Sequence, residues 1–213
     1  MARKGILFVI SGPSGVGKGT IREALLQKEN NLHLSISATT RPPRPGEVDG
    51  RDYYYLKTDS FLEMVNKHLF LEYAQVYNNY YGTPKSYVNE HLEAGHDVLL
   101  EIDIQGGMQI KDSMPGAVFI FIQPPSVEEL VSRLYGRGKD SQESIDRRLA
   151  ACESEMSKVV HYDYVVVNHR VSEAVSKVCA IITAERCRVK YYDIRGDRFD
   201  STYIERSDQN REK

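Results

Sequence analysis

Short apolar runs alternate along the chain with stretches in which apolar residues recur at helical spacing. The apolar runs predict strands over 5–11, 33–37, 97–103, 117–122 and 163–168. Three of them are continuously apolar, as strands buried on both faces should be. The amphipathic stretches predict helices over 18–29, 84–95, 105–113, 126–136, 142–160 and 171–188. This alternation predicts an α/β fold, in which helices cover both faces of a parallel sheet.

Two of these helices carry local start signals. Thr83 precedes Pro84, a pair that predicts an N-cap followed by proline at the first helical position. Ser126 and Glu129 have the spacing of a capping box, in which each side chain binds the other residue's backbone N–H. We therefore expect one helix to begin at Pro84 and another just after Ser126.

Three segments break the alternation. Residues 38–82 combine a Pro/Gly/Arg-rich loop with most of a cluster of eight tyrosines that lies between Tyr53 and Tyr87, out of fourteen in the chain. This shift in composition predicts a small inserted subdomain, with Tyr54 or Tyr55 in its core. Residues 135–148 are glycine-bracketed and arginine-rich, which predicts a lid joining two helices. Residues 191–213 have mixed charge and little apolar periodicity, which predicts a solvated, partly disordered tail.

Composition narrows the class of protein. The 213 residues, enough for one to two domains, are 41% apolar and 27% charged, as in ordinary globular proteins. Lys and Arg (28) nearly balance Asp and Glu (30), for a net charge of −2, which argues against a generally basic nucleic-acid binder. The apolar runs are far shorter than the ~20 residues that cross a bilayer, and the first is too short for a signal peptide. We expect a cytoplasmic protein without nucleic-acid or membrane partners.

Cysteine and histidine patterns give no sign of disulfides or transition metals. The three cysteines, Cys152, Cys179 and Cys187, form no CxxC pair, and an odd, sparse count predicts reduced thiols. The six histidines show no metal-ligand spacing. Ser14 and Ser37 have no accompanying His/Asp pattern, so a serine hydrolase is not supported.

The strongest local signal is the sequence GPSGVGKGT over residues 12–20, which follows an apolar strand and opens a helix. This is the context of a phosphate-binding P-loop, whose backbone N–H groups and helix N-terminus face phosphate oxygens. Lys18 would reach the β- and γ-phosphates. Gly19 stands where Ser or Thr usually reaches Mg²⁺, so either Thr20 takes that part or the metal is held through water.

A second signal is a pair of carboxylates, Glu101 and Asp103, at the end of the strand predicted over 97–103. In a parallel sheet the carboxyl ends of the strands share the edge at which ligands bind. Residues two apart in a strand point to the same side, and a carboxylate there could hold the waters of Mg²⁺. The alternative is an ordinary solvated strand end.

Arginines form a third signal, in two loops. Arg41 and Arg44 flank prolines that restrain the first loop. The second cluster consists of Arg133, Arg137, Arg147 and Arg148. Guanidinium groups pair bidentately with phosphate and neutralise the oxygens of a transferring phosphoryl group. The alternative for any one of them is a surface salt bridge.

The motifs GPSGVGKGT, SISATTRPPRPGEVDGRDYYY, FLEYAQVYNNYYGTP, LLEIDIQG, RLYGRG and IDRRL occur in one order along the chain. In this order they resemble guanylate kinases, from residue 4 to about 188. The resemblance implies a P-loop three-layer fold with a five-stranded parallel sheet. Its parts would be a core (4–37, 83–125 and 151–188), a GMP-binding subdomain (38–82), a helical lid (126–150) and a polar tail (189–213).

The resemblance also implies roles for individual residues. The guanine base would be read by Ser37, Glu72 and Thr83. The GMP phosphate would be held by Arg41, Arg44, Tyr53 and Tyr81, and Glu101, often Asp in this family, would lie near the base or ribose. ATP would contact Gly12, Pro13, Ser14, Gly15, Val16, Gly17, Lys18, Gly19, Thr20, Arg133 and Asn168. The catalytic residues would be Lys18, Arg44, Arg137 and Arg148. Mg²⁺ would be held with ATP by Thr20 and Asp103, through water.

The chemistry of the residues agrees with this assignment. Guanine presents N1–H and N2–H₂ donors on one edge, and the Glu72 carboxylate can accept both. The resemblance therefore implies transfer of the γ-phosphoryl group of MgATP to GMP, and to dGMP, in purine nucleotide metabolism. One alternative is an inactive protein-binding module, which would typically lack Lys18 and the lid arginines present here. The other is a kinase for a different nucleoside monophosphate, against which Ser37 and Glu72 argue.

Overall fold

A five-stranded sheet forms the centre of the protein, for which a computed structural model describes residues 3–76, 78–136, 150, 152 and 154–192. Its strands are β1 (Leu7–Ser11), β2 (Leu32–Leu34), β7 (Asp97–Glu101), β8 (Val118–Gln123) and β9 (Tyr164–Val167). They lie in the order β2-β7-β1-β8-β9, and every neighbouring pair is parallel. The predicted parallel sheet is confirmed, although β2 begins and ends earlier than the predicted strand 33–37.

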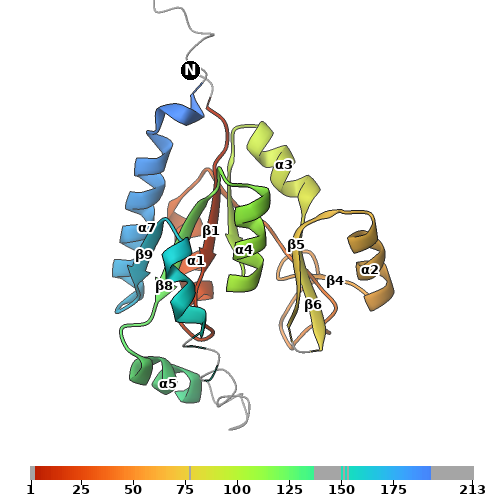
Figure 1. Ribbon diagram of the computed structural model, residues 1–213, viewed down its shortest axis with the longest axis horizontal. Coiled ribbons are helices and arrows are strands. Elements are labelled where there is room, and N and C mark those ends of the chain that lie inside the picture. The colour runs from red at the N-terminus through yellow and green to blue at the C-terminus, as the bar shows by residue number, and fades with distance from the viewer. Residues whose placement is uncertain (1–2, 77, 137–149, 151, 153, 193–213) are drawn as a thin grey trace, which may run out of the picture.

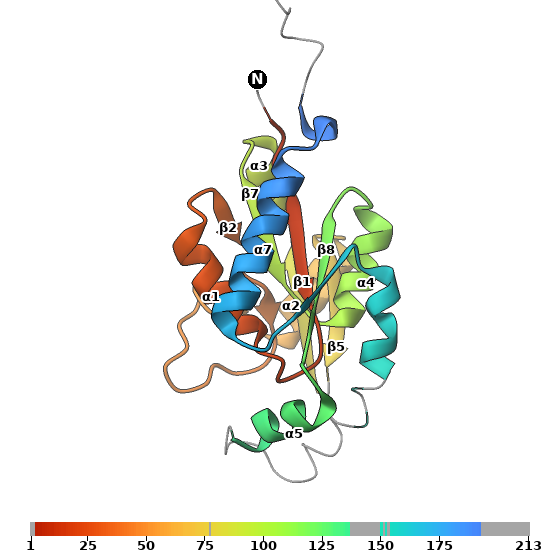
Figure 2. The same cartoon turned by 90° about the vertical axis from the view of Figure 1, so that its left-hand side faces the viewer.

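Helices cover both faces of this sheet, as Figures 1 and 2 show. The helices are α1 (Lys18–Lys28), α3 (Lys85–Glu93), α4 (Ile104–Ser113) and α7 (Val171–Arg186). Phe8 and Ile10 of β1 pack in one apolar cluster with α1 and α7. Leu7 and Val9 pack in a second cluster with α3 and α4. Because successive side chains of a strand alternate between the faces, burial of both faces requires the continuously apolar sequence of β1.

The inserted subdomain lies beside this sheet and carries its own four strands (Figure 1). They are β3 (Ala38–Thr39), β4 (Tyr54–Tyr55), β5 (Phe70–Val76) and β6 (Asn79–Pro84), in the order β4-β3-β6-β5, with α2 (Thr58–Asn66) packed against them. The core of the subdomain contains Phe61 and Phe70, whose stacked rings are 4.5 Å apart. The expectation that Tyr54 or Tyr55 packs there was wrong. Tyr54 is 39% exposed, and Tyr55 extends its hydroxyl to a carboxylate on a neighbouring loop.

The rest of the described chain consists of helical segments outside the sheet. Helix α5 (Val127–Gly136) follows β8, while residues 154–157 are helical and continue into the 3₁₀ helix η1 (Lys158–His161). Much of the predicted helix 142–160 lies outside the described residues. A second 3₁₀ helix, η2 (Val189–Tyr191), returns to the N-terminal segment, where Lys4 N–H donates to the Tyr191 carbonyl at 3.0 Å. The folded part therefore extends into the segment expected to be a polar tail. None of the described helices is both long and apolar enough to span a membrane.

Both predicted helix starts need correction. Thr83 is the penultimate residue of β6 and not an N-cap, because its hydroxyl is committed to the Glu72 carboxylate. Pro84 itself is the N-cap of α3, and no side chain caps that helix. At α5, the Ser126 hydroxyl accepts the Glu129 N–H at 3.2 Å, but the Glu129 carboxylate pairs with Arg133. Only half of the predicted capping box is therefore formed.

Candidate active site

A cavity of about 520 Å³ lies between the P-loop and the inserted subdomain. Its walls come from Gly12, Ser14, Lys18, Ser37, Arg41, Arg44, Tyr53, Glu72, Val76, Asn79, Tyr81, Glu101, Ile102, Asp103 and Glu155. The structure thus brings the predicted P-loop lysine, the two loop arginines, the two tyrosines and the candidate guanine-reading carboxylate to one cavity. These residues come from segments far apart in the sequence.

The P-loop supplies the anion-binding end of this cavity. Gly17 is the N-cap of α1 and has φ 99°, a conformation that residues with a side chain rarely adopt. Any Cβ at this position would also lie 2.8 Å from the Asn168 Nδ2. The N-cap glycine has no side chain with which to cap α1, and the first turn of α1 carries no acidic residue. The N-terminal turn of α1 therefore suits an anionic ligand.

Lys18 lies on the first turn of α1 and lines the cavity. Its ammonium group donates to the Gly12 carbonyl at 2.6 Å and to the Pro13 carbonyl at 3.2 Å. These bonds fold the side chain over the loop, so that its positive charge lies where phosphates would meet the α1 N-terminus.

Asn168 and Arg133 brace the P-loop from outside the cavity. Asn168 is buried, and its side-chain amide donates to the Val16 carbonyl at 2.8 Å. Arg133 donates to the Asn168 carbonyl at 3.0 Å and to the Val16 carbonyl at 3.5 Å. Neither residue lines the cavity. The sequence suggested contact with ATP for both, but gave no sign of this bracing role.

Glu72 of β5 also lines the cavity and is only 4% exposed. The Thr83 hydroxyl donates to its Oε1 at 2.7 Å. Burial raises the pKa of Glu72 to about 7, and the nearby Asp103 charge adds to this effect, although hydrogen bonds from Thr83 oppose it. The Glu72 carboxyl group therefore holds a proton to a higher pH than an exposed glutamate does, and a ligand with N–H donors would favour its ionised form.

Gly106 makes room for Glu72. It lies in the first turn of α4, where its N–H donates to the Asp103 carboxylate at 2.9 Å. An ideal Cβ on Gly106 would lie 2.5 Å from the Glu72 Oε2, closer than non-bonded atoms approach. Gly106 is the last residue of the LLEIDIQG motif. The sequence gave no reason for a glycine there, because Glu72 is distant in the chain.

Arg41, Tyr53 and Tyr81 lie together in the wall of the cavity. The Arg41 guanidinium carbon is 5.5 Å from the centre of the Tyr53 ring, and the Tyr53 and Tyr81 rings are 6.0 Å apart. Burial and the Glu101 charge raise the pKa of Tyr53, so its hydroxyl remains a hydrogen-bond donor at neutral pH. Guanidinium and phenol donors of this kind suit a phosphate group.

Acidic side chains line the wall beside the P-loop. Glu101 pairs with Arg22 at 3.1 Å, while Asp103 lies beyond the end of β7 and caps α4 with one oxygen. Glu155, which the sequence did not indicate, also lines the cavity. Burial raises the pKa of Glu155, whereas Lys18 lowers it.

This acidic wall fits a Mg²⁺ ion that arrives with a nucleotide. The Glu155 Oε2 is buried and has no hydrogen-bond partner within the described part of the chain. No group of three His, Cys, Asp or Glu residues in the described ranges is arranged to hold a metal by itself. Mg²⁺ bound with a nucleotide needs only one or two carboxylates, because phosphates and waters complete its shell. Thr20, the other predicted metal contact, is exposed on α1 and does not line the cavity.

The lid arginines Arg137, Arg147 and Arg148 lie outside the described residues. The structure therefore leaves the predicted roles of Arg137 and Arg148 untested. Arg133, at the described end of this segment, is held by the P-loop and by Glu129.

Comparison with known proteins gives a consistent result. A model of the guanylate kinase family matches residues 4–185. The guanylate kinase of Syntrophomonas wolfei is 58% identical over 195 residues, covering 92% of this chain and all of the relative. The guanylate kinase of Caldanaerobacter subterraneus is 54% identical, covering 88% of this chain and 91% of the relative. The crystal structure of guanylate kinase from Anaplasma phagocytophilum superposes with a TM-score of 0.75 at 33% identity, covering 89% and 90% of the two chains.

Proposed function

Because this chain belongs to the guanylate kinase family, we propose that the cavity between the P-loop and the inserted subdomain is where it transfers a phosphoryl group from ATP to GMP. The activity of the chain is that of an ATP:GMP phosphotransferase, with ADP and GDP as products. One observation carries the assignment of the site. Lys18 of the P-loop, the arginine pair and the buried Glu72 all line one cavity of about 520 Å³.

We assign the guanine base to the Glu72 end of the cavity. Glu72 in its ionised form would accept the guanine N1–H and N2–H₂ donors, with Ser37 and Thr83 beside it. Burial raises the pKa of Glu72 to about 7. At a pH where Glu72 is protonated in the free protein, GMP binding would therefore release that proton. Adenine lacks this pair of donors, so AMP would leave the buried carboxylate unmatched.

The GMP phosphate would lie between the base site and the P-loop, against Arg41, Arg44, Tyr53 and Tyr81. Glu101 would face the base or ribose of the same nucleotide. dGMP should also be accepted, because the contacts assigned to the guanine base and to the phosphate do not involve the 2′-hydroxyl group.

ATP would approach from the P-loop side. Backbone N–H groups of the loop from Gly12 to Thr20 would hold its phosphates, and Arg133 and Asn168 would lie towards its adenine. Mg²⁺ would be held through water by Asp103, with Glu155 beside it, and would neutralise phosphate charge when bound. Thr20 is a weaker candidate because it is exposed.

Transfer needs no general base, because the attacking phosphate oxygen of GMP is already ionised. The protein would position the two phosphates and stabilise the charge of the transition state. Lys18 and Arg44, which line the cavity, would provide this stabilisation, and Arg137 and Arg148 would join them from the lid. Changing Arg137 or Arg148 to Met should lower kcat ~10²–10³-fold and leave the affinity for GMP nearly unchanged.

A coupled assay with MgATP and GMP, dGMP, AMP, UMP or TMP tests the function. We expect GMP and dGMP to be phosphorylated, and Lys18→Met to serve as the inactive control. Turnover of AMP, UMP or TMP at the rate of GMP would refute the assignment of Glu72 to guanine. An inactive binding module, which the active relatives do not favour, would turn over none of them. The cytoplasmic location and the lack of nucleic-acid or membrane partners stay predictions.

A further inference from the structure

The two arginines proposed to hold the GMP phosphate lie on an irregular loop. This loop connects β3 to β4 and contains three prolines, at positions 42, 43 and 45. Proline has no backbone N–H, so few backbone donors are left to fix this segment. Side chains must therefore hold the loop in shape.

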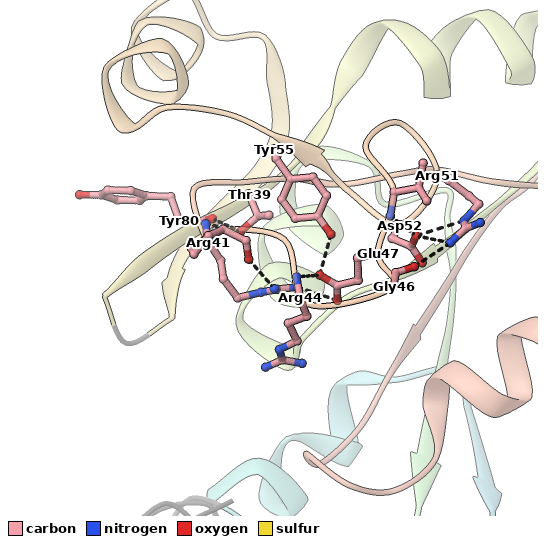
Figure 3. Close-up of polar contacts among 11 residues, drawn as sticks. Thr39, Arg41, Arg44, Gly46, Glu47, Arg51, Asp52, Tyr55 and Tyr80 are labelled. Atoms are coloured by element: carbon pink, nitrogen blue, oxygen red, sulfur yellow. Dashed lines mark hydrogen bonds and ion pairs between the residues drawn. The ribbon is translucent and has the colours of Figure 1, made fainter. Parts of the chain in front are cut away.

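Glu47 binds both ends of this segment (Figure 3). Its Oε1 accepts from the Arg41 guanidinium at 2.9 Å. Its Oε2 accepts from the Arg44 backbone N–H at 2.7 Å and from the Tyr55 hydroxyl at 2.7 Å. One carboxylate thus connects an arginine side chain, the backbone of a second arginine and a tyrosine of β4.

The contacts of Glu47 favour its ionised form. Burial favours a higher pKa, but the bonds from the Arg44 N–H, Tyr55 and Arg41 outweigh it and lower the pKa of Glu47 to about 2. The same contact, with burial, raises the pKa of Tyr55 to about 12. At neutral pH Glu47 is therefore ionised and accepts these bonds, while Tyr55 keeps the proton that it donates.

Glu47 leaves both arginines available to a ligand. Arg41 carries five N–H donors, more than its bonds to Glu47 and to the Pro42 carbonyl use. In Figure 3 the Arg44 guanidinium points away from the Glu47 carboxylate, which holds only the backbone of that residue. Both arginines line the cavity, whereas Glu47 does not.

We propose that Glu47 is a positioning residue, which holds the loop between Arg41 and Arg44 in the shape that presents both guanidinium groups to the phosphate of the nucleotide acceptor. The proposal rests on the assigned GMP site. Glu47 touches neither substrate. It acts by fixing one arginine through its side chain and the other through its backbone, with Tyr55 as the link to β4.

Glu47 has two opposite effects on phosphate binding, through the charge of Arg41 and through the shape of the loop. Glu47 also partly neutralises Arg41, so removing its charge could strengthen phosphate binding. Two of its three bonds hold the Arg44 backbone and Tyr55 and not the Arg41 charge. Because hydrogen bonds to an ionised carboxylate are stronger than those between neutral groups, losing the loop geometry should outweigh the gain in charge.

Steady-state kinetics of Glu47→Gln, with Tyr55→Phe as the milder variant, test this. For Glu47→Gln we expect KM for GMP to rise about 10- to 100-fold, while kcat and KM for ATP stay within about threefold of wild type. Tyr55→Phe removes one bond and should raise KM for GMP by a smaller factor. Inhibition by guanosine, which has no phosphate, should be unchanged in both. The matched control is Glu63→Gln, an exposed residue on α2 of the same subdomain.

Three results would overturn the proposal. The first is an unchanged or lower KM for GMP in Glu47→Gln. The second is a rise in KM for ATP equal to that for GMP. The third is a loss of inhibition by guanosine equal to the rise in KM for GMP. If Glu47→Gln does not fold, an unchanged KM for GMP in Tyr55→Phe counts equally against it. Failure of the proposed function is a separate result, because then the wild-type enzyme would not phosphorylate GMP.

Discussion

Glu72, the residue proposed to bind guanine, is a buried carboxylate. Because burial disfavours its charged form, Glu72 should destabilise the nucleotide-free protein at neutral and alkaline pH. Its pKa rises from the ordinary value of 4.5 in the unfolded chain to about 7 in the folded protein. The folded state therefore holds the proton more tightly, and Glu72 favours folding at low pH. This contribution is complete below pH 4.5 and is lost as the pH rises through 7.

Glu72→Gln removes the titrating group and nearly keeps its size. A pKa shift of this extent should lower the free energy of unfolding of the wild-type protein by about 2–3 kcal/mol between pH 5 and pH 8. We expect Glu72→Gln to resemble wild type at pH 5 and to be more stable by that amount at pH 8. For a chain of this length the difference in Tm at pH 8 is roughly 5–10 °C. Activity should change in the other direction, with kcat/KM for GMP falling ~10²–10⁴-fold because Gln presents a donor to a guanine donor.

Differential scanning fluorimetry of both proteins without nucleotide, from pH 5 to pH 8, measures the stability effect. The exposed Glu63→Gln should leave Tm nearly unchanged at each pH. A constant difference in Tm between Glu72→Gln and wild type across this range would refute the reasoning, because it would mean that Glu72 does not titrate there. A loss of kcat/KM for GMP below about threefold would remove Glu72 from the guanine site.

Three further outcomes follow from other contacts of the site and the core. Gly106→Ala places a Cβ against Glu72, so kcat/KM for GMP should fall at least about tenfold while KM for ATP changes little; equal losses for both substrates would contradict this. Asn168→Ala removes the brace on the Val16 carbonyl, at a cost of about 1–3 kcal/mol, and should raise KM for ATP more than KM for GMP in steady-state kinetics. Asp97→Asn removes the charge of a fully buried carboxylate that pairs with two arginines. The free energy of unfolding, measured in urea, should fall by about 3–5 kcal/mol. A change below about 1 kcal/mol would refute a structural role.

The sequence by itself determined the central sheet and the P-loop. Both are local signals, because apolar runs such as β1 must be buried on both faces, and the glycines before Lys18 allow a strand to turn directly into a helix. It also indicated the insertion after Ser37, through a change in composition. The resemblance to a family then supplied a role for Glu72 that no local pattern could give.

Only the tertiary structure decided which side chains meet. Thr83 looked like a helix cap, but packing against β5 gave its hydroxyl to Glu72 instead. Gly106, Glu155 and the brace from Asn168 to the P-loop depend on contacts between residues distant in the chain, and a sequence pattern records no such distances. The pKa of Glu72 is decided in the same way, because burial by neighbouring elements, and not the residue's own sequence context, sets how strongly its carboxylate holds a proton.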